Sequence, residues 1–170
     1  MIEFNPQKQV LYEDNHIIIV NKWPSQIVQG DKTGDQPISE ALKIYLKQKY
    51  NKPGNVFLGV VHRLDRPVSG VLVFARTSKS LTRLNKMISE REIQKTYWAV
   101  VKEPPSLASD HLVHFLSRNQ KMNKSFASLK QNKDSKRAEL KYLHLLSSKS
   151  YHLLEVELLT GRHHQIRAQL

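Results

Sequence analysis

Val60-Val61-His62-Arg63-Leu64-Asp65-Arg66-Pro67-Val68-Ser69-Gly70 is the most informative stretch of this sequence. Apolar residues precede its charged centre, and a second apolar run from Val71 to Ala75 follows it. Such a pattern is typical of two strands joined by a polar loop. The loop carries one carboxylate, Asp65, between Arg63 and Arg66, with His62 three residues before it. We therefore expect a strand, a charged loop and a second strand.

Two interpretations of Asp65 remain open from the spacing alone. Nearby cations favour the ionised carboxylate, which suits nucleophilic or charge-stabilising chemistry better than general-acid chemistry. Alternatively, Asp65 pins a turn through local salt bridges, since Asp is common in turns.

A second candidate segment runs from Leu158 to Arg167 and contains Thr160-Gly161-Arg162-His163-His164-Gln165-Ile166. We expect Gly161 to open a helix with Arg162 in its first turn, where the partial positive charge of the helix end favours an anion. Adjacent histidines on a helix point about 100° apart, so His163 and His164 are poorly arranged to share one metal ion. The sequence therefore predicts an anion site and no metal site.

The third candidate segment, Lys95 to Val101, has the composition of a strand that ends before Pro104-Pro105. Side chains alternate along a strand, so Lys95 and Tyr97 share one face and Trp98 lies on the other. Tyr97 either faces a polar cleft and stacks on a base, or is an ordinary half-buried strand aromatic.

The remaining elements alternate between strands and helices. We expect strands at 10–12 and 16–20, a loop at 23–36, a helix from Pro37 to about residue 50, strands at 56–61 and 71–75, a helix capped by Thr77 or Ser78, and strands near 111–116, 124–129, 137–146 and 151–159. This order predicts an α+β domain with a largely antiparallel or mixed sheet.

The composition narrows the class of protein. The chain has 170 residues, no cysteine and a formal net charge of +12. That length fits one domain, and the lack of cysteine excludes disulfide scaffolds and Cys-ligated metals and fits a cytoplasmic location. No apolar run is long enough to span a bilayer, so we expect no membrane partner.

The excess charge points to a polyanionic partner, and it lies in two stretches. Residues 60–102 carry nine basic and three acidic side chains, and residues 117–141 carry eight basic and two acidic ones. Either stretch is suited to a phosphate backbone. For the second, a solvated and mobile basic loop is an equal alternative. A protein that binds DNA or an anionic membrane surface by charge alone is a further alternative.

Taken together and in order, His62-Arg63-Leu64-Asp65, Ser69-Gly70, Lys95-x-Tyr97 and Thr160-Gly161-Arg162-x-His164-Gln165-Ile166-Arg167 resemble the RNA pseudouridine synthases. Within them the chain is similar to the large-ribosomal-subunit synthase A type, from about residue 10 to residue 170. The resemblance implies a central mixed, mainly antiparallel sheet flanked by helices, with an active-site cleft across it.

The resemblance also implies an activity. The protein would flip out a uridine of structured ribosomal or transfer RNA and isomerise it to pseudouridine, with no cofactor and no metal.

Asp65 matches the catalytic aspartate, which attacks the ribose C1′ or assists a glycal route. Tyr97 matches the tyrosine that stacks on the flipped base, and Arg162 the arginine that pairs with the catalytic carboxylate. Arg63 matches a residue that displaces the target base. The other expected substrate-binding residues are His62, Arg66, Lys95 and Arg167. The alternative function is a catalytically silent RNA-binding domain.

Three features depart from the family pattern. Val68 stands where the family usually has Thr. Trp23-Pro24-Ser25 follow Lys22, where the family commonly has Pro-x-Gly. The sequence ends at Leu170, inside the helix expected after Gly161. We therefore expect residues 1–170 to form a single catalytic domain that is truncated and lacks C-terminal strands, with no separate N-terminal RNA-binding domain.

Overall fold

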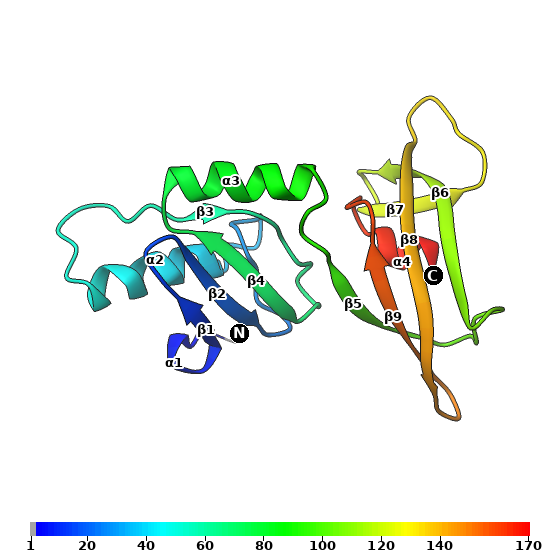
Figure 1. The fold of residues 1–170 in the computed structure, drawn as a ribbon, viewed down its shortest axis with the longest axis horizontal. Coiled ribbons are helices and arrows are strands. Elements are labelled where there is room, and N and C mark those ends of the chain that lie inside the picture. Colours follow the sequence, from blue (N-terminus) through cyan, green and yellow to red (C-terminus); the bar gives the residue numbers. More distant parts are fainter. Residues whose placement is uncertain (1–2) are drawn as a thin grey trace. The chain divides into compact units, whose positions relative to one another are not determined.

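The computed structural model describes residues 3–170, which form two compact units that divide between Glu90 and Arg91. Each unit has its own antiparallel sheet (Figure 1).

The first unit is built on a four-stranded sheet with the order β1-β2-β4-β3. Its elements are α1 (Pro6–Gln9), β1 (Val10–Glu13), β2 (Ile17–Lys22), α2 (Ile38–Lys49), β3 (Gly59–Val60), β4 (Gly70–Ala75) and α3 (Ser78–Ser89). The long central pair, β2 and β4, is joined along six residue pairs, from Ile17 opposite Ala75 to Lys22 opposite Gly70.

Alternation along β2 and β4 makes the core of this unit. Ile18 and Val20 of β2 lie opposite Phe74 and Leu72 of β4, and all four side chains are buried. Helix α2 packs on that face through its apolar stripe, which includes Leu42. The sheet and helix therefore bury one continuous hydrophobic cluster.

Helix α3 lies alongside β3 and β4 (Figure 1). It begins with a capping box, in which Thr77 Oγ1 accepts from the Ser80 backbone N–H and the Ser80 hydroxyl accepts from the Thr77 N–H. Gly59 permits the close approach of the helix, because a Cβ at that position would stand only 2.8 Å from Leu81 Cδ2.

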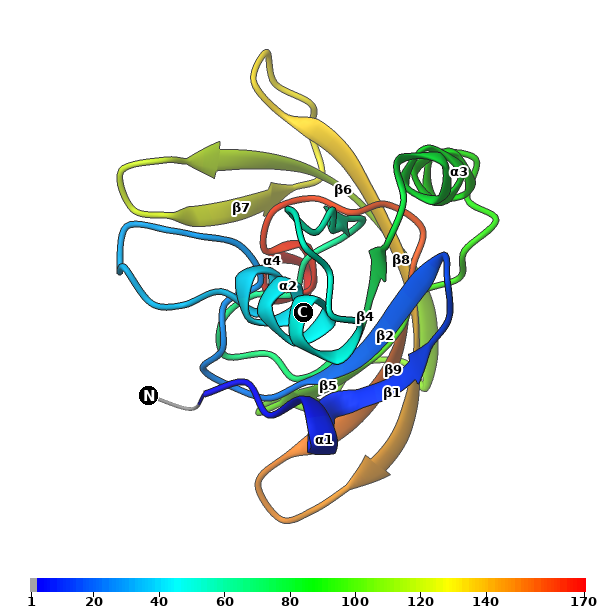
Figure 2. The same cartoon turned by 90° about the vertical axis from the view of Figure 1, so that its left-hand side faces the viewer.

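The second unit is built on a five-stranded sheet with the order β5-β9-β8-β6-β7. Its elements are β5 (Thr96–Val101), β6 (Ser109–Asn119), β7 (Lys124–Ser128), β8 (Lys136–Ser147), β9 (His152–Leu158) and α4 (Gln165–Gln169). The sheet curves around α4 (Figure 2). Buried residues of β8 and β9 form the core on that face, and Ile166 of α4 packs against them.

The structure confirms the α+β class and most of the expected elements. The strands form two antiparallel sheets. The expected strand at 56–61 is shorter than predicted, because only Gly59 and Val60 pair with β4. Among residues 3–170, no helix is long and apolar enough to cross a membrane.

Candidate active site

The predicted aspartate loop connects β3 to β4 in the first unit. Asp65 is exposed to solvent, and its carbonyl accepts a hydrogen bond from the Val68 N–H at 3.0 Å, which closes a turn behind the carboxylate. Arg63 is also exposed. His62 is half-buried, and its Nε2 accepts from the Val73 N–H at 3.2 Å. The loop therefore presents Asp65 and Arg63 outward, whereas His62 ties the loop to β4.

A buried lysine lies beneath this loop. Lys22 ends β2 on the same face as Ile18 and Val20, and its side chain is fully buried. Its ammonium donates to the carbonyls of Trp23 at 3.1 Å and Arg66 at 3.0 Å, and also to the carbonyl of Val68. A buried charge needs such partners, because an unsatisfied one is costly. Lys22 thus fixes the backbone on the C-terminal side of Asp65.

Lys22 and Asp65 also interact electrostatically. Burial lowers the pKa of Lys22 to about 8, and the negative charge of Asp65 opposes part of that lowering. Lys22 is therefore a cation close to the candidate carboxylate and fixed by the fold.

Arg66 connects the aspartate loop to a second loop of the first unit. Its guanidinium forms an ion pair with Asp35, and its carbonyl accepts from the Ser25 N–H at 2.8 Å. Through these contacts Arg66 ties the aspartate loop to the loop that precedes α2. The Arg66 guanidinium thus pairs with a carboxylate from a different loop.

In the second unit, β5 carries Tyr97 as predicted. The strand alternates between exposed and half-buried residues, so Trp98 is exposed and Tyr97 turns inward. Tyr97 packs against the buried cluster that contains Leu140 and Val156. The alternation predicted for β5 is confirmed. Lys95 lies just before the strand, and its carbonyl accepts from the Leu158 N–H at 3.0 Å.

The segment around Arg162 is not helical, so the prediction that Gly161 opens a helix is wrong. Helix α4 begins at Gln165, and His164 before it adopts a left-handed conformation with φ of 51°. The side chain of Gln165 replaces the missing helical bonds, because its Oε1 accepts from the Arg162 N–H at 3.0 Å and from Thr160 Oγ1 at 2.8 Å. Its Nε2 donates to the Glu139 carbonyl at 2.9 Å. A side chain thus shapes the turn that carries Arg162.

Cations gather at this turn. Arg162 is exposed, and its Nε donates to the Arg137 carbonyl at 3.0 Å. The Lys95 ammonium lies 3.8 Å from the position that a Cβ on Gly161 would take. Arg167 is exposed on α4. The turn is therefore suited to an anionic group, although no helix end contributes to it.

The predicted site residues divide between the two units. His62, Arg63, Asp65 and Arg66 belong to the first, and Lys95, Tyr97, Arg162 and Arg167 belong to the second. No group of three or more His, Asp or Glu side chains within residues 3–170 is placed to hold a metal ion.

Sequence reasoning missed two residues that shape these segments, Lys22 and Gln165. The burial of Lys22 could not be read from the sequence, because Ile17 and Ile19 make the other face of β2 equally apolar and only the structure shows which face is buried. Gln165 belongs to the third motif of the family resemblance, but its contacts could not be read from the sequence, since its partners Glu139 and Thr160 are brought to it by the pairing of β8 with β9.

Comparison with known proteins identifies the family. The profile of the family described as RNA pseudouridylate synthase matches residues 16–170, which include the aspartate loop, β5 and the Arg162 turn. The chain belongs to this family.

Curated relatives of this pseudouridylate synthase chain match it over nearly its whole length. Ribosomal large subunit pseudouridine synthase D of Zymomonas mobilis is 32% identical over 165 residues, which are 95% of this chain and 51% of the relative. Ribosomal large subunit pseudouridine synthase C of Buchnera aphidicola from Schizaphis graminum is 35% identical over 167 residues, 96% of this chain and 50% of the relative. The chain thus spans about half the length of these relatives.

Solved structures share the fold. Human RNA pseudouridylate synthase domain containing 4 matches with a TM-score of 0.79 and 22% identity, over 95% of this chain and 63% of that one. Human RNA pseudouridylate synthase domain containing 1 matches with a TM-score of 0.71 and 19% identity, over 99% of this chain and 66% of that one. The pseudouridine-synthase-like fold expected from the sequence is confirmed.

Proposed function

We propose that this chain isomerises a uridine within structured RNA to pseudouridine. In that reaction the bond from ribose C1′ to N1 breaks and a bond from C1′ to C5 forms, while C5 loses a proton and N1 gains one. The atoms balance, so the reaction consumes no second substrate. The proposal is carried by the match to the RNA pseudouridylate synthase family over residues 16–170.

The proposed catalytic residues are Asp65, Tyr97 and Arg162. Asp65 supplies the carboxylate that acts at C1′, and its exposure on a loop braced by Lys22 supports this role. Tyr97 offers an aromatic ring to the flipped base, and Arg162 offers a guanidinium for the carboxylate. These residues come from both units, and we propose that residues 1–170 act together as one catalytic domain.

The remaining predicted residues are proposed to bind RNA. A uridine in folded RNA must be flipped out, which costs a few kcal/mol. Arg63 is exposed beside Asp65 and has the charge and reach to enter a base stack. Lys95, Arg66 and Arg167 are proposed phosphate contacts, and His62, which bonds the loop to β4, is proposed to bind the substrate beside Arg63.

We propose the finer assignments on the same basis. Within the family the chain is assigned to the large-ribosomal-subunit synthase A type, because of its motifs at 62–70, 95–97 and 160–167. Ribosomal or transfer RNA is the proposed substrate, and the names of the C-type and D-type relatives support ribosomal RNA. The cytoplasm is the proposed location, in keeping with a sequence that has no cysteine.

Release of tritium tests the activity. Transcripts of large-subunit ribosomal RNA and of transfer RNAs, labelled with uridine tritiated at C5, should lose tritium to water when incubated with the chain. Asp65→Asn should bind the same RNA and release none, because the amide cannot supply the carboxylate. If the unaltered chain binds RNA but releases no tritium from any transcript, it is instead a catalytically silent RNA-binding domain.

A further inference from the structure

An exposed aromatic residue lies on the edge strand of the second unit. Phe126 of β7 is 49% exposed, and β7 is the last strand of its sheet. Ser117 lies directly opposite Phe126, and Lys124 and Ser128 are its neighbours on the same face of β7. These neighbours are small or flexible, so nothing in the register covers the phenyl ring.

Two exposed cations share that face. Lys124 stands two residues before Phe126, and Arg137 of β8 lies opposite Phe115, which faces the same way. Arg137 contacts the carboxylate of Glu139 at 3.4 Å, yet its side chain remains 59% exposed. Residues 117–141 include eight basic side chains but only two acidic ones, Asp134 and Glu139. The surroundings of Phe126 are therefore strongly positive.

Trp98 shows that exposure alone does not distinguish this position. Trp98 of β5 is on the same face of the sheet and is 72% exposed, more than Phe126. Its cross-strand partner is Glu155, and Glu157 follows on the same face. Carboxylates there repel a phosphate backbone, so an aromatic ring in a cationic setting occurs at Phe126 and not at Trp98.

We propose that Lys124, Phe126 and Arg137, named here the β7 platform, bind a single-stranded segment of RNA. Phe126 stacks on one base, and the two cations contact flanking phosphates. The inference rests on the proposed function, because RNA is the substrate that the function requires. One ring between serines and cations fits an unpaired base, whereas a duplex hides its base faces and a membrane needs a larger apolar area.

The β7 platform is linked to the Arg162 turn through shared strands. Ser125, on the opposite face of β7, donates to the His163 carbonyl at 2.6 Å, and its hydroxyl lies 3.0 Å from His163 Nδ1. Arg162 Nε donates to the carbonyl of Arg137 itself. Because Ser125 faces away from Phe126, the platform and the Arg162 turn lie on opposite sides of β7, and we assign the platform to RNA beyond the target uridine.

Fluorescence anisotropy with a fluorescein-labelled oligouridine of 12 nucleotides tests the platform. Phe126→Ala should weaken binding by the full 170-residue chain about tenfold, because one stacked base is lost, and Phe126→Tyr should restore it. The double variant Lys124→Gln with Arg137→Gln should reduce the slope of log affinity against log salt by about 1.4, as expected for two phosphate contacts on a single strand.

Trp98→Ala is the matched control, because it removes a more exposed aromatic residue from the acidic part of the same face. It should leave the affinity unchanged. The platform is disproved if Phe126→Ala binds oligouridine as tightly as the unaltered chain, or if Trp98→Ala weakens binding as much. Tritium release by the unaltered chain separates the platform from the proposed activity. If the unaltered chain releases tritium but Phe126→Ala binds oligouridine normally, only the platform is overturned. If Phe126→Ala weakens binding but the unaltered chain releases no tritium, the platform is supported and the proposed activity is contradicted.

Discussion

Lys22 occupies an unusual position for a lysine. Its side chain is fully buried, and its ammonium donates hydrogen bonds to the carbonyls of Trp23, Arg66 and Val68 in place of water. Two of these carbonyls belong to the loop that presents Asp65. The ammonium therefore works as a fixed support for that loop, and its charge also acts on the Asp65 carboxylate. Lys22, a residue outside the loop, thus stabilises it together with the contacts of His62 and Arg66.

Substitution of Lys22 by Met should loosen the aspartate loop. The carbonyls of Trp23, Arg66 and Val68 would lose the ammonium as a donor, although that of Arg66 keeps the Ser25 N–H, and each group left unsatisfied costs about 1–3 kcal/mol, part of which relaxation recovers. We expect the free energy of unfolding to fall by about 2–4 kcal/mol, measured by urea denaturation, and tritium release to be lost. Lys43→Met is the control, because Lys43 pairs with Glu40 on the surface and should cost no more than about 1 kcal/mol. Equal stabilities of the two variants would contradict this role for Lys22.

The pKa of Lys22 predicts how its effect depends on pH. Burial lowers that pKa to about 8 in the folded protein, against an ordinary value of 10.5. Between these two values the unfolded chain binds the proton and the folded chain does not, so the free energy of unfolding rises with pH. The stability of the unaltered chain relative to Lys22→Met should therefore increase from about pH 8 to pH 10.5, by at most about 1.4 kcal/mol per pH unit. A difference that stays flat or falls over this range would show that the lysine is not deprotonated on folding.

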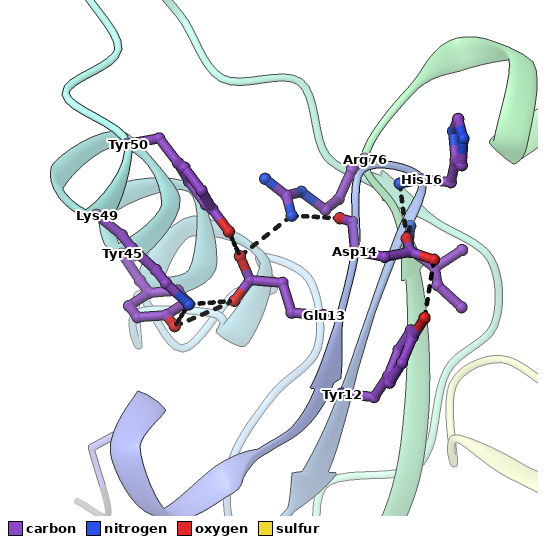
Figure 3. A network of polar contacts seen from close by, with 9 residues as sticks. Tyr12, Glu13, Asp14, His16, Tyr45, Lys49, Tyr50 and Arg76 are labelled. Carbon is purple, nitrogen blue, oxygen red and sulfur yellow. Dashed lines mark hydrogen bonds and ion pairs between the residues drawn. The ribbon is translucent and has the colours of Figure 1, made fainter.

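At the scale of elements, Glu13 joins three parts of the first unit (Figure 3). Glu13 is the last residue of β1. Its carboxylate accepts hydrogen bonds from Tyr45 at 3.1 Å and Lys49 at 3.0 Å, and from Tyr50 at the end of α2. Arg76, which follows β4, pairs with it at 3.1 Å. Burial by itself raises the pKa of Glu13, but the hydrogen bonds from Tyr50, Lys49 and Tyr45 outweigh it and lower the pKa overall. The carboxylate therefore fixes α2 against the strands.

Glu13→Gln should weaken the attachment of α2. The variant leaves the cations of Arg76 and Lys49 without their carboxylate, and removing one partner of a buried ion pair costs about 3 kcal/mol. Because the folded pKa of Glu13 is lowered, its contribution is present at neutral pH and is lost as the pH falls through that value. Thermal unfolding should show a large difference between Glu13→Gln and the unaltered chain at pH 7, and a smaller one in acid. Glu40→Gln, on the exposed face of α2, is the control, and a loss as large as that of Glu13→Gln would contradict the prediction.

The elements that the sequence predicted are those with a strong local signal. A continuous apolar run indicated β2, alternation indicated β5 and β9, and Thr77 marked the start of α3 through its own side chain. The errors arose where distant contacts decide. Residues 56–58 lack a strand partner although they are apolar, and Gln165 bends the chain before α4 through bonds to β8. The aspartate loop was predicted, but the lysine beneath it depends on the pairing of β2 with β4.

For the whole molecule, the net charge of +12 distinguishes partners poorly. A chain that binds by charge alone holds every polyanion with similar strength, and its affinity falls steeply with salt. Aromatic rings change this, because stacking on a base survives salt and requires an unpaired base. Tyr97 and Phe126 supply rings for the proposed function, in addition to the basic stretches at 60–102 and 117–141.

The chain should therefore prefer RNA with unpaired uridines. At about 150 mM salt, exposed charges more than about 8 Å apart are largely screened. Under that condition we expect the chain to bind such RNA at least tenfold more tightly than a DNA duplex of equal length, because one stacked base contributes about 1–3 kcal/mol. Vesicles that contain phosphatidylserine should bind no better than the DNA. Competition experiments against one labelled RNA measure all three ligands together. Equal competition by RNA, DNA and vesicles would mean that the charge alone governs binding, and would favour a general polyanion-binding protein over an RNA-modifying one.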